Sequence, residues 1–200
     1  MPLLFYLHKG LGRGNGVSFV DSTKLAVCHN RRSSGHRVFR GQAERGKTSV
    51  GWCFGFKLHL VFNDCGELLT FRLTPGNVAA RAPVPQVANW LVGKLFGAKG
   101  YLSQTLVKHR SQQFGVELST PRRKNMKQVE LPLIDRIRLR KRAIVETIID
   151  QLKKSSHIEH TRHRSPVNFL VNLLCGLIAS CHQPKKPSLQ LGKLPPAMIA

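Results

Sequence analysis

The stretch GVSFVDSTKLAV, residues 16–27, constrains the fold more than any other part of the sequence. Its β-branched and aromatic residues predict a buried strand, and strand alternation puts Phe19, Asp21 and Thr23 on one side. Aspartate is depleted from strands, and an ionised carboxylate on an apolar face is costly unless another group compensates it. Asp21 therefore needs a partner from elsewhere in the chain.

The charge of the chain indicates its kind of partner. The 200 residues include 32 Lys and Arg against 10 Asp and Glu, a formal net charge of +22. This charge is spread over a sequence with hydrophobic periodicity and 42% hydrophobic residues, which favours one folded domain that handles DNA or RNA. Charge alone does not separate an enzyme from a passive binding protein, so both classes remain open.

Cysteine usage and apolar runs exclude several other classes. The five cysteines form no C-x-x-C pair, which argues against a zinc knuckle and a disulfide framework. The start, MPLLFYLHKG, lacks the basic region and the apolar length of a signal peptide. The longest later apolar stretch, FLVNLLCGLIAS, is much shorter than the roughly 20 residues that span a bilayer. We expect a reducing, cytoplasmic location and no membrane partner.

The order of patterns along the chain predicts a mixed sheet flanked by helices. The expected elements are a strand over 16–27, a basic loop over 30–51, a hairpin over 52–77 with its turn at NDCGE, a helix over 84–96, a fourth strand before KGY, a short helix from Ser103 to Gly115, a strand over 116–121, a long helix over Leu133–Lys154, a helix over Pro166–Ser180 and a loose tail.

Two of the few acids stand out by their position. Asp64 and Glu67 fall in the hairpin turn, where solvated carboxylates are ordinary. Glu146 lies on the long helix four residues after Arg142, so one interpretation is a local ion pair. The other is that Asp21 and Glu146 converge on Mg²⁺, which prefers oxygen ligands and in pairs promotes phosphodiester chemistry. The spacing leaves both interpretations open.

Several blocks, in order, resemble one family. VSFVDSTKLAVCHNRR, GWCFGFKLHLVFNDCGELLTFRLTPGN, KLFGAKGYLS, RKNMK, LRKRAIVETIIDQLK and IEHTRHRSPVNFLVNLLCGLIA are similar to bacterial insertion-sequence transposases of the DDE type, in the group numbered nine-eight-two. The resemblance implies an RNase H-like α/β fold, with three antiparallel strands, then two parallel strands, and flanking helices. It divides the chain into an N-terminal remnant over 1–16, the DDE domain over 17–182 and a loose tail over 183–200.

The resemblance also implies an Asp, Asp, Glu triad that binds two Mg²⁺ or Mn²⁺ ions. Asp21 is the expected first acid and Glu146 the third, both as catalytic residues and metal ligands. The second acid is expected before KGY, where this chain has Ala98. Since alanine cannot bind a metal, the loss of this carboxylate should cost orders of magnitude in rate.

Basic residues are the expected DNA contacts. Arg142, Glu146 and Lys153 match a helix signature of related transposases, although Leu139 stands in place of its Tyr, and Lys153 is expected on a DNA phosphate. The run PRRKNMK is either a solvated face or a border of the DNA channel. In the second interpretation Arg122, Arg123, Lys124 and Lys127 bind DNA, and the helix signature adds Arg142 and Lys153 to the expected DNA-binding residues.

The resemblance thus implies DNA transposition by metal-dependent strand cleavage and transfer. The partners expected are double-stranded transposon ends and target DNA, in a bacterial cytoplasm at the nucleoid, with self-association or mixed oligomers with an intact transposase. Family members carry several tens of residues ahead of the first strand, so we expect a truncated protein that Ala98 impairs. The alternative is a non-catalytic basic protein that binds DNA and represses an intact transposase.

Overall fold

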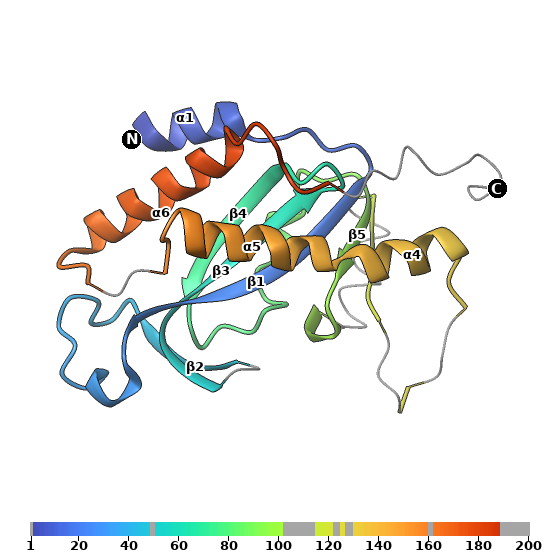
Figure 1. Cartoon of the computed structure of the whole chain (residues 1–200). Helices are drawn as coiled ribbons and strands as arrows, with labels where there is room; N and C mark the ends of the chain where they lie inside the picture. Colours follow the sequence, from blue (N-terminus) through green and yellow to red (C-terminus); the bar gives the residue numbers. More distant parts are fainter. Residues whose placement is uncertain are drawn as a thin grey trace.

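The computed structural model describes residues 2–48, 51–101, 115–121, 125–126, 130–159 and 162–188. Helices and a curled mixed sheet make up this part of the chain (Figure 1). The strands are β1 (Val17–Cys28), β2 (Glu44–Thr48), β3 (Gly51–Asn63), β4 (Leu68–Pro75), β5 (Gly93–Gly97) and β6 (Val116–Ser119). The helices are α1 (Pro2–Gly10), η1 (Asn30–Arg32), α2 (Val84–Val87), η2 (Lys99–Tyr101), α4 (Leu133–Lys141), α5 (Ala143–Ser155) and α6 (Pro166–Cys181).

The sheet has the order β2-β3-β1-β5-β6, and β4 also pairs with β3. The pairs β1–β3, β2–β3 and β3–β4 are antiparallel, whereas β1–β5 and β5–β6 are parallel. The predicted mixed α/β class is confirmed. β1 therefore lies at the junction between the antiparallel and the parallel parts of the sheet, and it carries Asp21 at that junction.

Two apolar clusters cover the two faces of the sheet. The larger joins Phe19 and Leu25 of β1 to α1, α5 and α6 through residues such as Leu7, Val145 and Phe169. Figure 1 shows α5 crossing this face of the strands, with α1 beside α6. The smaller cluster contains Val20 of β1 together with residues of α2, β5 and β6. Both faces of β1 are thus buried, as its run of apolar residues predicts.

The predicted helix over 84–96 is wrong beyond its first turn. Only Val84–Val87 is helical, and the residues from Gly93 onward form β5. Gly93 has φ +85° and lies against the Gly16 backbone, a position that only glycine fits easily. Trp90 is 88% exposed, so this segment has no continuous buried helical face. Pairing with β1 decides its structure instead.

Two further boundaries differ from the sequence prediction. The basic loop contains β2, whose residues 44–48 have no strand-like apolar alternation and are ordered by pairing with β3. The long helix is interrupted at Arg142, which separates α4 from α5. The predicted short strand is confirmed as β6, and the last helix as α6, with the Ser165 hydroxyl accepting hydrogen bonds at its N-terminus. The helix predicted from Ser103 lies outside the described residues.

Candidate active site

Arg142 brings the two predicted acids together. Its Nη1 donates to Asp21 Oδ2 at 3.1 Å, and its Nη2 lies 3.4 Å from Glu146 Oε1. The helix break after α4 directs this guanidinium towards β1, while Glu146 in the first turn of α5 reaches it from four residues further along. The local ion pair of the first interpretation is therefore present, and Asp21 shares the same arginine, whereas the joint binding of Mg²⁺ by the two acids stays a prediction.

Ala98 is the next residue along the chain after the strand that borders Asp21. Val20 of β1 pairs with Gly97 of β5 in parallel register, so Asp21 and Ala98 follow at equivalent positions. Adjacent strands lie about 4.8 Å apart, which makes position 98 a close neighbour of Asp21. Ala98 is partly buried against the smaller apolar cluster, and its carbonyl accepts a hydrogen bond from Tyr101 N–H at 3.0 Å.

The surroundings of Asp21 disfavour the ionised form of its carboxyl group. Burial raises the pKa of the Asp21 carboxyl above its ordinary value, and the Glu146 carboxylate acts in the same direction. The Ser22 N–H, which donates to Asp21 Oδ1 at 2.8 Å, and Arg142 oppose this shift without cancelling it. Burial likewise raises the pKa of the neighbouring Tyr101 hydroxyl. A cation bound here would relieve the cost of ionising Asp21.

Of the other residues predicted to contact DNA, the structure describes Lys153 but not the basic run that begins at Arg122. Lys153 lies on α5, but its Nζ is 2.9 Å from Glu159 Oε2, so this ammonium already has a carboxylate partner. The predicted DNA-binding residues Arg122, Arg123, Lys124 and Lys127 lie outside the described residues. Asp64 and Glu67 accept hydrogen bonds from Asn15 and Asn63 around the hairpin turn, as expected of structural carboxylates.

Three comparisons with known proteins bear on this arrangement. The family model described as a transposase DDE domain matches residues 11–166. The chain belongs to this family. Among solved structures, a piggyBac transposase synaptic complex with hairpin DNA is similar at 12% sequence identity and a TM-score of 0.45, over 62% of this chain and 27% of that chain. A search of curated proteins found no match.

Membership of the DDE transposase family raises the question of divalent metal. Across the part of the chain that the structure describes, no group of three His, Cys, Asp or Glu side chains could hold a metal ion. Asp21 and Glu146 are the two carboxylates of this cluster, and Ala98, which follows β5 beside Asp21, supplies none. These two carboxylates do not by themselves make up a metal site, and we derive no catalytic step from them.

Sequence reasoning missed one buried acid of this DDE domain. Asp135 in the first turn of α4 is 2% exposed, and it pairs with Lys94 of β5 and with Arg138 at 3.5 Å. Its spacing from Arg138 was a visible signal, but the Lys94 partner lies 41 residues away and depends on how α4 packs. Through Lys94, Asp135 joins α4 to strand β5 of the sheet.

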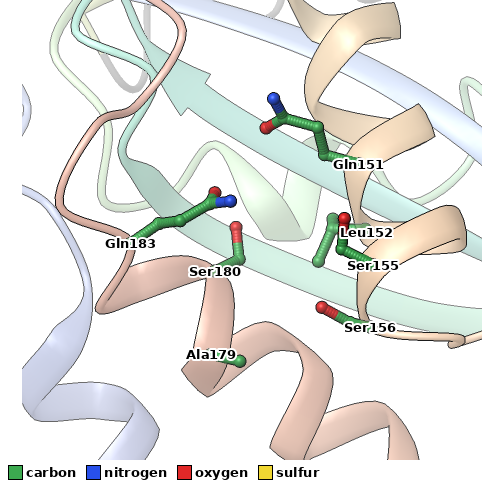
Figure 2. Close-up of a pocket in the computed structure, with 7 residues that line it drawn as sticks. All are labelled: Gln151, Leu152, Ser155, Ser156, Ala179, Ser180 and Gln183. Carbon is green, nitrogen blue, oxygen red and sulfur yellow. The ribbon is translucent and has the colours of Figure 1, made fainter.

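A depression between α5 and α6 has no titratable side chain among its described lining residues. It measures about 230 Å³ and is lined by Gln151, Leu152, Ser155, Ser156, Ala179, Ser180 and Gln183. In Figure 2, Gln183 and Ser180 lie across from the α5 side chains. Neutral amides and hydroxyls provide neither a charged metal ligand nor an acid–base pair. No helix within the described residues is long and apolar enough to cross a membrane.

Proposed function

We propose that this chain is a DDE transposase domain of RNase H-like fold that binds DNA and has lost most of its strand-cleaving activity. The observation that carries the proposal is the set of three adjacent positions: Asp21 and Glu146 share Arg142, and Ala98 follows β5 beside Asp21. Two carboxylates and a vacant third ligand position suit a two-metal site from which one acid has been removed.

The chemistry of the restored site follows from the same positions. A carboxylate at position 98 would extend from the strand next to Asp21, with Glu146 opposite on α5. Two divalent ions among these acids would activate a water or a 3′ hydroxyl and stabilise the oxygen that leaves phosphorus. Transposon ends and target DNA are the proposed substrates, and the net charge of +22 supports a polyanionic partner.

The test is to restore the acid. Ala98→Asp should give Mg²⁺- or Mn²⁺-dependent nicking of a transposon-end duplex, about 10²- to 10³-fold above the unsubstituted chain. Ala98→Asn is the matched control, since it has nearly the same size without the charge. A folded Ala98→Asp protein whose nicking equals that of the Asn variant would refute the catalytic ancestry of the site.

Ala98 also favours a second candidate function, which is binding without chemistry. A chain that holds transposon ends but cannot cut them would compete with an intact transposase. Adding it to a strand-transfer reaction of an intact relative should then lower the rate in proportion to occupancy of the ends. No inhibition at concentrations that saturate end DNA would exclude this function.

A further inference from the structure

A basic surface lies beyond the end of β1, away from the Asp21–Arg142–Glu146 cluster. Between Asp21 and Glu44 the sequence contains no Asp or Glu. It contains four arginines with exposed side chains, none of which forms an ion pair with an acid of the described residues: Arg31, Arg32, Arg37 and Arg40. The positive charge of this segment is therefore uncompensated within the described structure.

The turn that presents two of these arginines is fixed to the sheet. Asn30 Nδ2 donates to the Trp52 carbonyl of β3 at 2.6 Å, and Ser33 Oγ donates to the Asn30 carbonyl at 2.7 Å. These bonds hold the η1 turn, on which Arg31 and Arg32 are consecutive. Because the backbone is held in place, little chain ordering opposes binding of a ligand by the two guanidinium groups.

The two arginines border a polar cavity. It measures about 470 Å³ and is lined by Val27, Cys28, Arg31, Arg32, Ser34, Gly35 and His36. His36 packs its ring on the buried Phe39, with centroids 5.6 Å apart. Its Nε2 is buried and makes no hydrogen bond within the described structure. We call Arg31, Arg32, Ser34, Gly35 and His36 the basic pocket.

We propose that the basic pocket binds the phosphodiester backbone of duplex DNA at a second site, distinct from the acid cluster. Guanidinium groups match phosphate oxygens with paired hydrogen bonds, and the exposed Ser34 hydroxyl adds a neutral one. The proposal rests on DNA being the partner under the proposed function. The proposal names residues that contact the DNA backbone, and it does not depend on DNA cleavage.

The position of the pocket sets the length of DNA that reaches both sites. Asp21 and Cys28 are separated by seven residues of β1, roughly 23 Å at the rise of an extended strand. Duplex DNA advances 3.4 Å per base pair, so this span corresponds to about seven base pairs. A duplex of at least this length reaches both sites at once, whereas a shorter one reaches only one of them.

The experiment measures how salt weakens binding, in EDTA so that no chemistry occurs. The affinity of a labelled 20-base-pair duplex is measured by anisotropy across a range of NaCl concentrations. Arg31→Gln with Arg32→Gln should lower the slope of log K against log salt by about 1.8, or 0.9 per lost phosphate contact. The matched control is Arg72→Gln with Arg81→Gln, which removes the same charge from exposed positions on and after β4.

Two outcomes would overturn the proposal: an unchanged slope in the pocket variant, or an equal loss of slope in the control pair. Circular dichroism checks that each variant is folded, and Arg31→Lys with Arg32→Lys should keep the slope while weakening binding several-fold. Since this assay reads binding without metal, it can succeed when the Ala98→Asp nicking test fails, and the reverse is also true.

A second arm separates DNA from free phosphate. The chain has two tryptophans, so Trp90→Phe leaves Trp52, whose backbone carbonyl accepts the hydrogen bond from Asn30, as a fluorescent reporter near the pocket. Duplex DNA should change this emission, and a six-base-pair duplex, which is too short to reach both sites at once, should bind with a smaller salt slope than the 20-base-pair duplex. Saturation by inorganic phosphate that duplex DNA fails to displace would assign the pocket to small anions and refute the proposal.

Discussion

Two acidic clusters on the same sheet differ in how their charge is balanced. Asp135 is 2% exposed and contacts two cations, Lys94 and Arg138. Even with Glu117 at 3.8 Å from Lys94, that cluster has as many positive as negative groups. In the other cluster the 19% exposed Asp21 and the 63% exposed Glu146 share the single cation Arg142.

This difference separates a structural role from a binding role. A buried carboxylate with two cationic partners is satisfied, and it joins α4 to β5. A pair of acids with one cation retains negative charge, and the pKa of Asp21 is raised because burial is not fully compensated. Perturbed groups of this kind gather at functional sites. The predictions below test whether the two clusters behave as differently as their charges indicate.

The largest expected effect is on cleavage in the Ala98→Asp background. There, Asp21→Asn should lower metal-dependent nicking roughly 10³-fold, about 4 kcal/mol of transition-state stabilisation. Asp64→Asn, in the hairpin turn, is the control and should leave the rate within a factor of two or three. Equal losses in both variants would mean that Asp21 has no special part in the chemistry.

The balanced cluster should respond in stability instead. Asp135→Ala leaves Lys94 and Arg138 without their buried partner and should lower the free energy of unfolding by about 3 kcal/mol, as measured in urea. Asp21→Asn should cost far less, since Arg142 keeps Glu146. If Asp21→Asn were the more destabilising substitution, the structural role would belong to the Asp21 cluster and not to the Asp135 cluster.

The buried His59 should dominate the pH dependence of folding stability, so its contribution has to be separated from that of the two acidic clusters. Burial lowers the pKa of His59 to about 4, and its Nε2 lies 3.0 Å from Thr74 Oγ1. The unfolded chain binds a proton at His59 more readily than the folded chain does. The free energy of unfolding is therefore highest above pH 6.5 and decreases as the pH falls towards 4.

The loss between pH 6.5 and pH 5 should be about 2 kcal/mol, measured by urea unfolding at each pH. In His59→Gln this part of the pH dependence should disappear, leaving the contribution of the acids. A profile that keeps the same slope in the variant would assign it to groups other than His59.

The smallest effect concerns metal affinity. Arg142→Gln removes the cation that competes for Asp21 and Glu146, and should tighten Mn²⁺ binding about tenfold by calorimetry, or about 1.4 kcal/mol. Arg138→Gln, in the balanced cluster, should leave the affinity unchanged. Weaker binding in Arg142→Gln would show that the arginine positions the acids rather than competing for them.

The sequence was informative where local pattern and tertiary structure agree. Strand β1 and the need of Asp21 for a partner followed from alternation and the cost of burying charge, and the structure supplies Arg142. The helical spacing of Arg142 and Glu146 placed both on one side of the helix. The mixed sheet flanked by helices followed from the order of the elements.

The sequence predictions failed where contacts between residues distant in sequence determine the local structure. Strand β2 has no alternation of its own and exists because β3 pairs with it. The 84–96 segment has apolar spacing suited to a helix, but Gly93 fits against Gly16 and turns the chain into β5. The partner of Asp135 is Lys94, a contact that no local spacing encodes.

The break between α4 and α5 has a mechanical consequence. Arg142 is both the residue that separates α4 from α5 and the residue whose guanidinium contacts two acids. A change in the angle between α4 and α5 would therefore move the Arg142 side chain. The electric field at Asp21 and Glu146 would then change with the geometry of the helix break.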